Sequence, residues 1–347
     1  MKSDTRVKKP KKTKNSPAGR KKAGFEDGVR SVLVAGIVVC AVVLGAAGIF
    51  AARSVLGGGF TPPPSTGDAP AEAEGSGEGF GTETFPELED AIRQLEADRE
   101  SGVRPVLPGV PAAGKGGEAG LPSERRGILV FVIDDAGNNL KELDPFLAFP
   151  GPLTIAVLPG LPYSAEAAKK VRDAKKEVFL HQPMEPLGGQ DPGPGAIKTG
   201  MDDQEIRQII TKNLAGVWPV AGMNNHEGSK VTMDPEMMRT VLELCRENRI
   251  HFLDSRTTAD TAAPGVAADM GFAIARRDVF LDNEQGRDEI IQAIEQGCRK
   301  AERDGLAVMI GHAWSPRLAG ILAEMYPGLV KKGFFLTTVS GILDAGK

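Results

Sequence analysis

The sequence has 347 residues, and its 42 Lys and Arg against 46 Asp and Glu give a formal net charge of −4. That length allows two average domains or one large α/β barrel with attachments. The mild net charge gives no global argument for nucleic-acid binding. The charge is unevenly spread, because residues 1–30 hold eleven Lys and Arg against three acidic residues. A nucleic-acid-binding tail would explain this excess, but the next segment explains it more simply.

Residues 31–52 contain no charged side chain. Twenty-two such residues are enough to cross a hydrocarbon core of roughly 30 Å as a helix. Because Lys and Arg crowd the N-terminal side, the positive-inside rule predicts a cytoplasmic N-terminus and export of the remaining chain. We therefore expect a basic cytoplasmic tail (1–30) and a transmembrane helix (31–52) in a single-pass membrane protein. The exported part would lie in the periplasm or at the cell surface. A cleaved signal peptide is the alternative, but the apolar run is long for a signal core and no clean Ala-x-Ala site follows it.

Residues 53–125 are rich in Gly, Pro and Glu, a composition that cannot bury a core and predicts a flexible linker. Within this linker, residues 86–96 have apolar side chains at helical spacing and predict a short helix, either free or docked. The three cysteines show no metal-binding spacing: Cys40 lies in the expected membrane span, and Cys245 and Cys298 lie in helical patterns. Buried thiols fit the last two better than a disulfide, which is the alternative in an oxidising compartment.

Residues 126–347 alternate regularly between apolar runs and helical patterns. We expect strands at 127–135, 153–158, 177–181, 220–226, 250–254, 272–275, 306–312 and 334–339. Helices are expected at 140–148, 164–176, 202–217, 235–248, 287–303 and 316–332. Such alternation predicts an α/β fold with right-handed crossovers, and a barrel of parallel strands fits the length better than an open sheet. Neither glycine-rich nucleotide-binding motif is present, so a nucleotide-binding protein has no support.

The first of these strands ends in two adjacent carboxylates. An apolar run, Ile128 to Ile133, is followed by Asp134 and Asp135 and then, after one alanine, by Gly137. Successive strand residues point to opposite sides, so the two carboxylates cannot do the same job if the strand continues through them. A turn Asp followed by a helix N-cap is the purely structural interpretation.

Polar residues of catalytic type gather at the ends of the predicted strands. The sequence has only four histidines, and three of them end strands, whereas His251 begins one and is expected to be structural. Because the carboxyl ends of parallel strands share one face of the fold, where α/β proteins build their sites, we expect these residues to lie on one rim. The residues concerned are Asp135, His181, His226, Asp254 and His312.

One carboxylate and two imidazoles form a ligand set for a catalytic Zn²⁺ or a similar divalent metal. We assign Asp135, His181 and His226 to that set. A metal in such a site makes a bound water acidic and polarises a carbonyl, which brings amide or ester hydrolysis within reach. Asp134 is then placed to act as the general base, and His312 to protonate the leaving group.

At these residues the sequence resembles the divergent polysaccharide deacetylases, relatives of the carbohydrate esterases that have a distorted (β/α)7 barrel. The resemblance runs from Gly127 to about Leu343. It depends on five segments taken together: Val132 to Gly137, His181 to Pro186, Met223 to Ser229, Phe252 to Thr258 and Ile310 to Ala313. It implies that Asp134 is the base, Asp135 a metal ligand and His312 the histidine of a late strand.

The chain departs from the mainstream enzymes in two places. Those enzymes carry both metal histidines in one His-x-x-x-His segment, which is missing here, so His181 and His226 are assigned from their placement. The Arg-x-Pro motif is also missing. We expect Arg256, beside Asp254 at the catalytic rim, to serve instead as the anion or oxyanion partner.

The leading hypothesis is a membrane-anchored, metal-dependent deacetylase that acts on an acetylated cell-envelope polysaccharide, with zinc as the metal and no nucleic-acid partner. A non-catalytic envelope protein, which uses the same barrel to bind a glycan or a protein partner, is the alternative. A metal-free glycosidase that uses Asp135 and Asp254 is a third hypothesis. Trp218 and Trp314 are expected either to stack on sugar rings or to pack. Four polar residues flank His226 and are expected to contact the site or the sugar hydroxyls: Asn224, Asn225, Glu227 and Ser229.

Overall fold

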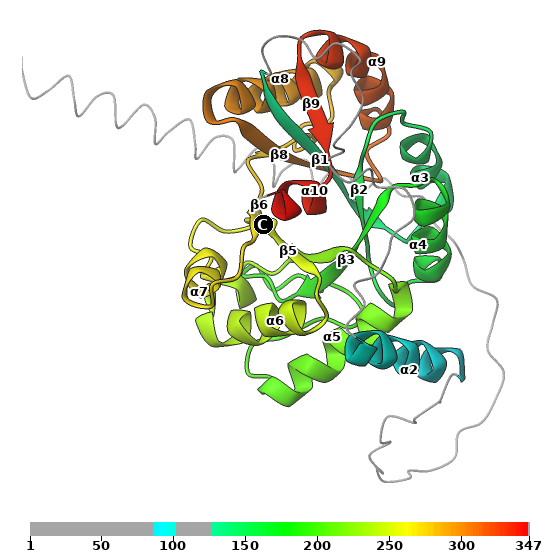
Figure 1. Cartoon of the computed structure of the whole chain (residues 1–347), viewed down its shortest axis with the longest axis vertical. Helices are drawn as coiled ribbons and strands as arrows, with labels where there is room; N and C mark the ends of the chain where they lie inside the picture. The colour runs from blue at the N-terminus through cyan, green and yellow to red at the C-terminus, as the bar shows by residue number, and fades with distance from the viewer. Residues whose placement is uncertain (1–85, 102–125, 346–347) are drawn as a thin grey trace, which may run out of the picture. The chain divides into compact units, whose positions relative to one another are not determined.

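The computed structural model describes residues 86–101 and 126–345 (Figure 1). They belong to one compact unit, Phe80–Lys347. The predicted basic tail, the predicted membrane span and most of the predicted linker lie outside the described residues. Within the part of the chain that is described, no helix is both long and apolar enough to cross a membrane.

Parallel strands make up a single nine-stranded sheet, in the order β6-β5-β4-β3-β2-β1-β8-β7, with β9 also paired to β1. The strands are β1 Gly127–Ala136, β2 Thr154–Val157, β3 Glu177–Met184, β4 Gly222–Glu227, β5 His251–Asp254, β6 Ala275–Arg276, β7 Val279–Phe280, β8 Leu306–His312 and β9 Phe334–Thr337. The apolar runs that predicted most of these strands are buried on both faces, as a covered parallel sheet requires.

Helices follow most of the strands and surround the sheet (Figure 1). They are α3 Leu140–Leu147, α4 Ser164–Asp173, α5 Asp203–Val217, α6 Pro235–Glu247, α7 Ala263–Asp269, α8 Arg287–Asp304 and α9 Leu318–Lys331. Local capping sets several of their boundaries. Asp202 and Glu205 form a capping box at the start of α5, and α6 begins with an Asp234 cap followed by a proline.

The sheet curls until its two edges meet. Strands β6 and β7 stand at opposite ends of the strand order, yet only Arg277 and Asp278 separate them in the chain. These two residues bridge the seam, because the Arg277 N–H donates to the Asp254 carbonyl of β5 (3.0 Å) and the Asp278 N–H to the Val308 carbonyl of β8 (2.8 Å). The result is a curled, parallel α/β sheet consistent with a distorted (β/α)7 barrel. The single strand that was predicted at 272–275 is wrong, because the chain crosses the seam here as two very short strands.

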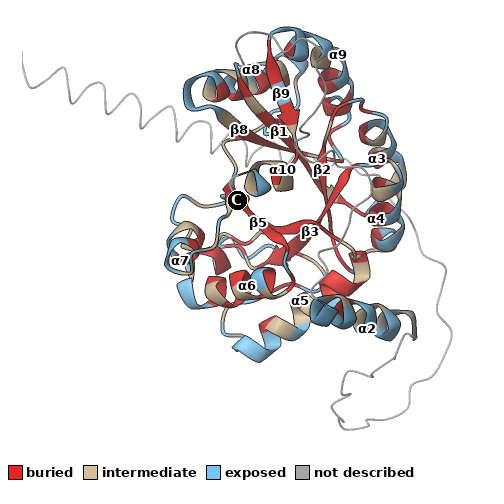
Figure 2. Cartoon of the chain, viewed as in Figure 1, coloured by how far each residue is buried: buried red, intermediate tan, exposed pale blue. Residues whose placement is uncertain are grey.

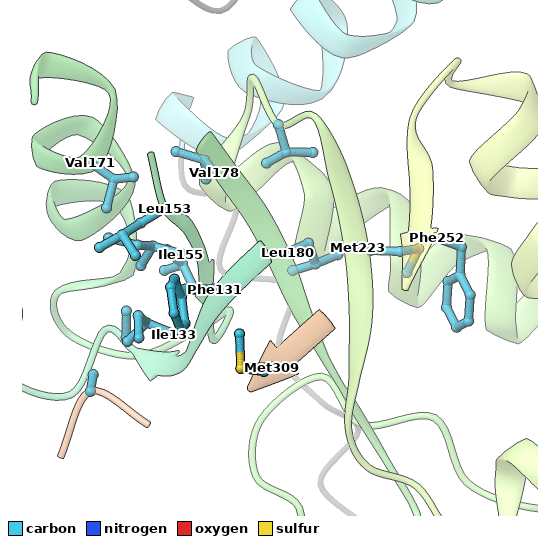
Figure 3. Packing of buried hydrophobic residues seen from close by; sticks show 14 of the residues in the cluster. Phe131, Ile133, Leu153, Ile155, Val171, Val178, Leu180, Met223, Phe252 and Met309 are labelled. Carbon is cyan, nitrogen blue, oxygen red and sulfur yellow. The ribbon is translucent and has the colours of Figure 1, made fainter. Parts of the chain in front are cut away.

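Two apolar clusters occupy the two faces of this sheet. Val130, Val132, Phe179, Leu253 and Ile310 belong to the cluster that also contains the C-terminal helix. The alternate positions of the same strands belong to the larger cluster shared with the surrounding helices. Figure 3 shows part of the larger cluster, with Val171 of α4 beside the side chains of β1, β2 and β3. Figure 2 shows the strands as mostly buried and the outer faces of the helices as exposed.

A C-terminal helix, α10 Val339–Asp344, fills the barrel at the amino ends of the strands. It lies at the centre of the ring of strands in Figure 1 and packs on the inner apolar cluster. Its contacts reach the first residues of three strands. The Val339 N–H donates to Thr154 Oγ1 (3.1 Å), the Ser340 N–H to the Glu177 carboxylate (3.3 Å), and His251 Nε2 lies 3.3 Å from an Asp344 oxygen. The strand predicted over 334–339 therefore ends early, because Thr338 caps α10.

The helix predicted inside the linker is present and docked. Helix α2, Pro86–Ser101, packs beside α5. Leu95 of α2 is buried in the larger apolar cluster, and Trp218 Nε1 donates to Asp98 Oδ2 (2.9 Å). Trp218 therefore packs against α2. The expectation of thiols is confirmed, because Cys245 and Cys298 are both free.

Candidate active site

The two carboxylates at the end of β1 face the same site. A bulge interrupts the pairing of β1 with β2 between Ile133 and Ala136, and Asp135 within it has a φ of 64°. A bulge with a left-handed residue re-aims a side chain that a regular strand would send to the other face. As a result, His181 Nε2 lies 3.6 Å from Asp134 Oδ2 and 3.2 Å from Asp135 Oδ1. A regular strand would send the two carboxylates to opposite faces, but the strand is irregular here, so both face the same site.

Asp135, His181 and His226 come together as a candidate metal centre, with ligand atoms all within 4.8 Å of one another. His226 Nδ1 lies 3.0 Å from Asp135 Oδ1 and 3.2 Å from His181 Nε2. The buried Asp135 Oδ1 makes no hydrogen bond among the described residues. A buried carboxylate oxygen left without a donor is costly, and a divalent cation between it and two imidazole nitrogens removes that cost. The residues present therefore fit a metal.

The remaining ring nitrogen of His181 is also held in place. His181 Nδ1 contacts Asn224 Oδ1 at 2.9 Å. Because the amide oxygen only accepts, His181 carries its proton on Nδ1 and donates it in this hydrogen bond, and Nε2 faces the site. Burial disfavours ionisation of Asp135, but its contacts with the two imidazoles outweigh burial and hold the pKa of Asp135 well below its usual range. A carboxylate that is ionised at all ordinary pH values suits a metal ligand.

Asp134 is the second carboxylate and lies deeper, at 2% exposure. Asn224 Nδ2 donates to both of its oxygens, at 2.9 and 3.1 Å. Burial raises the pKa of Asp134 above its ordinary value, against the opposing charges of His181 and His312. A carboxyl group whose affinity for a proton is increased in this way is suited to take up and release one during a reaction.

His312 lies beside Asp134 on the neighbouring strand, since the two residues are direct partners in the pairing of β1 with β8. Its Nδ1 lies 2.8 Å from Asp282 Oδ1, and its backbone N–H donates to Asp282 Oδ2 (2.8 Å). Since an ionised carboxylate only accepts, His312 carries a proton on Nδ1 and presents Nε2 to the site. Burial lowers the pKa of His312, but the hydrogen bond to Asp282 and its charge raise it overall above the usual value.

Sequence reasoning missed Asp282. Asp282 follows the very short strand β7 in the same way that Asp135 and His312 close longer ones. A strand of two residues leaves no periodic apolar pattern, so its polar end could not be recognised as part of the rim.

Arg256, the expected anion or oxyanion partner, is held by a second arginine, Arg277. Arg256 is exposed, and its backbone N–H donates to Asp254 Oδ1 (2.8 Å). Arg277 is the more enclosed of the two. Its guanidinium donates to the Ser255 carbonyl (2.6 Å) and the Arg256 carbonyl (2.7 Å) and lies 3.7 Å above the Phe280 ring. Arg277 therefore holds the loop that carries Arg256.

Asp254 ends β5 and is not one of the three residues that form the candidate metal centre. Its neighbour Leu253 belongs to the inner apolar cluster, whereas Phe252 belongs to the cluster shared with the helices. Because strand side chains alternate, Asp254 points to the same side as Phe252. Asp254 Oδ2 is buried without a hydrogen bond among the described residues, and burial raises the pKa of this carboxyl. The geometry gives no support to a pair of catalytic carboxylates made by Asp135 and Asp254.

The protein is thus a curled parallel α/β sheet with a candidate metal centre at the carboxyl ends of its strands. An Asp–His–His cluster forms this centre, and a further Asp and His flank it. The chain belongs to the divergent polysaccharide deacetylase family, which matches residues 131–343. The resemblance seen in the sequence is thereby confirmed.

Three comparisons place the chain among known proteins. The uncharacterized protein YibQ of Escherichia coli K12 is 34% identical over 199 residues, 57% of this chain and 62% of the relative. An uncharacterized protein of Haemophilus influenzae is 29% identical over 184 residues, 53% of this chain and 66% of the relative. The chain thus matches less than two thirds of the length of either. The uncharacterized protein ATU2773 of Agrobacterium tumefaciens has a similar fold, with a TM-score of 0.60 at 19% identity over 64% of this chain and 91% of that one.

Proposed function

We propose that the protein is a zinc-dependent deacetylase that hydrolyses acetyl groups on a cell-envelope polysaccharide. The observation that carries the proposal is the cluster of Asp135, His181 and His226, in which a buried carboxylate oxygen faces two imidazole nitrogens without a hydrogen bond. Zn²⁺ favours such a set of one carboxylate and two imidazoles. When bound, it supplies Lewis-acid activation of water and of the acetyl carbonyl.

The residues around the cluster divide the proton transfers between them. Asp134, next to the metal ligand and with a pKa raised by burial, takes up the proton of the hydrolytic water. His312 acts as the imidazolium, which its raised pKa favours. It keeps the Nδ1 proton on Asp282 and gives the Nε2 proton to the leaving nitrogen or oxygen of the sugar. Asn224 links the metal cluster to the proposed base, because it contacts both His181 Nδ1 and the Asp134 carboxylate.

The rim of the site supports a sugar substrate. Four of the large apolar side chains that stay exposed lie in the segments that directly follow strands β2, β3, β4 and β8, at the same end of the sheet as the cluster. Sugar rings present apolar C–H faces that pack on such side chains. The residues are Tyr163, Leu187, Met233 and Trp314. The family description points to the same class of substrate.

Metal analysis of the purified protein tests the ligand assignment. Replacing Asp135, His181 or His226 with alanine should remove most of the bound metal, because each supplies one of three protein ligands. His251→Ala is the matched control, because His251 lies at the amino end of β5, beside Asp344. Equal metal content in the ligand variants and the wild type would refute the assignment.

Acetate release then tests the reaction. The metal-loaded protein should release acetate from an acetylated glycan or from a small acetyl ester. If the wild type holds metal and releases no acetate from any such substrate, a non-catalytic barrel that binds a glycan or a protein partner is the better description.

The proposed location is the envelope side of a membrane, with residues 31–52 as an uncleaved anchor and residues 1–30 in the cytoplasm. The support is the uncharged run of 22 residues and the excess of Lys and Arg before it. A reporter fused after residue 60 should be active only if it is exported, and protease added outside the membrane should digest or release the C-terminal part. Protection of residues 126–347 by an intact membrane would overturn the location and the envelope substrate together.

A further inference from the structure

Trp314 makes the contact that determines how the carboxylate of Asp135 is presented. Its indole Nε1–H donates to Asp135 Oδ2 at 2.7 Å. The other oxygen, Oδ1, is the one that faces His181 and His226. One oxygen of the carboxylate is therefore already occupied by a donor, and one is left for a cation.

The same indole also contacts the neighbouring histidine. Trp314 stacks on His312 with ring centres 4.8 Å apart and an angle of 21° between the planes. Phe280 stacks on the His312 ring with centres 5.9 Å apart, also at 21°. Arg277 covers Phe280 in turn. The rings therefore stack in the order Phe280, His312, Trp314. Trp314 is the end of the stack that contacts the metal cluster through Asp135, and it remains 41% exposed.

The turn that carries Trp314 is fixed on both sides. The preceding residue, Ala313, is buried, and its N–H donates to the Asp134 carbonyl (2.9 Å). The following residue, Ser315, is also buried, and its N–H donates to the His312 carbonyl (3.1 Å). An exposed tryptophan between two anchored residues is held in position by the backbone, so its N–H is directed before any ligand binds.

We propose that Trp314 is a positioning residue that holds Asp135 in a one-oxygen mode toward a divalent cation and, with the face of the same ring, keeps His312 in its working orientation. The inference rests on the proposed metal-dependent function and adds a residue outside the ligand set. Hydrogen-bonded partners of metal ligands typically contribute 10–100-fold to metal affinity. A ligand with its second oxygen occupied also leaves more coordination positions open for water and substrate.

Trp314→Phe separates the two roles, because phenylalanine keeps a ring to stack on His312 and lacks the N–H. The chain offers a matched control in Trp218→Phe, which removes an indole N–H that donates to a carboxylate, Asp98 Oδ2, beside α2. Trp314→Ala removes both the ring and the N–H. We would load each purified protein with Co²⁺ and measure its dissociation constant by competition with a chelator, together with its visible absorption, which reports the number of bound ligand atoms.

Trp314→Phe should bind Co²⁺ about 10–100-fold more weakly than the wild type. Its visible absorption should indicate a higher coordination number of the Co²⁺, because Asp135 Oδ2, freed from the indole N–H, can also bind the ion. Trp218→Phe should match the wild type in both measurements. At saturating metal, Trp314→Phe should regain acetate release, whereas Trp314→Ala should remain slower by up to ~100-fold because His312 is no longer aligned.

Unchanged Co²⁺ affinity and spectrum in Trp314→Phe would overturn the role of the N–H. Equal acetate release by Trp314→Phe and Trp314→Ala would overturn the role of the ring. Absence of Co²⁺ binding in the wild type would refute the metal site itself and with it this inference. If the wild type binds metal and releases no acetate, only the catalytic part of the proposed function is refuted. The role of the N–H is decided by the Co²⁺ affinities, which do not depend on acetate release.

Discussion

Replacing Asp282 with asparagine should change the acid–base behaviour of His312. Asp282 accepts two hydrogen bonds from His312, one from the backbone N–H and one from Nδ1. Asparagine offers a single oxygen, so one of the two donors loses its partner, and the negative charge is lost as well. A hydrogen bond to a charged group stabilises by about 1.5–3 kcal/mol, and one pKa unit corresponds to about 1.36 kcal/mol. We therefore expect the pKa of His312 to fall by about one to two units.

The assay is an NMR titration of the histidine ring protons in metal-free protein. The sequence has only four histidines, so His312→Gln identifies the resonance of His312. Asp278→Asn is the matched control: Asp278 likewise accepts a backbone N–H of β8, from Val308 at 2.9 Å, and pairs with Lys300 rather than with an imidazole. The control should leave the pKa of His312 unchanged. An unchanged pKa of His312 in Asp282→Asn would refute the reasoning.

The free energy of unfolding should also depend on the His312–Asp282 pair. The direction of its pH dependence follows from the raised pKa of His312. The folded-state pKa of His312 lies above its ordinary value of 6.5. The pair therefore stabilises the folded protein fully below pH 6.5, and this contribution is lost as the pH rises through the folded-state pKa. In urea unfolding, Asp282→Asn should lose most relative to the wild type at about pH 5–6 and less as the pH rises further. A loss that is independent of pH would show that only the backbone contact matters.

Three further outcomes are expected. Asp134→Asn should keep its fold and bound metal and lose about 10²–10⁴ in the rate of acetate release; a near-normal rate would exclude Asp134 as the base. Burial raises the pKa of Glu177, so the free energy of unfolding of the wild type should decline as the pH rises above 4.5 through the folded-state pKa. Glu177→Gln should flatten that decline in unfolding measurements between about pH 4 and 8. Leu95→Ala should remove about 2–5 kcal/mol of packing from α2 and speed its amide hydrogen exchange; equally fast exchange in the barrel strands would show that the two unfold together.

The strands with long apolar runs and the capped helices could be predicted from local pattern alone. Ile128 to Ile133 and Leu306 to His312 are buried strands, as expected, because period and β-branched composition are properties of neighbouring residues. Strands β6 and β7 could not be found in this way. Each has two residues and exists only because the sheet closes across Arg277 and Asp278. Helix α7 was missed as well, because its seven residues include three alanines and show no apolar period.

For the site, the sequence by itself indicated the reactive side chains: a pair of carboxylates after the first strand and histidines at the ends of three others. Alternation along a strand indicates which residues share a face, but it assumes a regular backbone. The bulge at Asp135, which turns both carboxylates of β1 toward His181, depends on the pairing with β2.

Tertiary structure alone decided the partners of those residues. Asp282 meets His312 across 30 residues of chain, and Trp314 meets Asp135 across 179. The physical reason is that a hydrogen bond between strands or loops depends on the register and curvature of the whole sheet, which long-range packing sets. Residue type and placement at strand ends therefore predicted the residues of the candidate metal centre. Only the curled sheet revealed the aspartate that contacts His312 and the tryptophan that contacts Asp135.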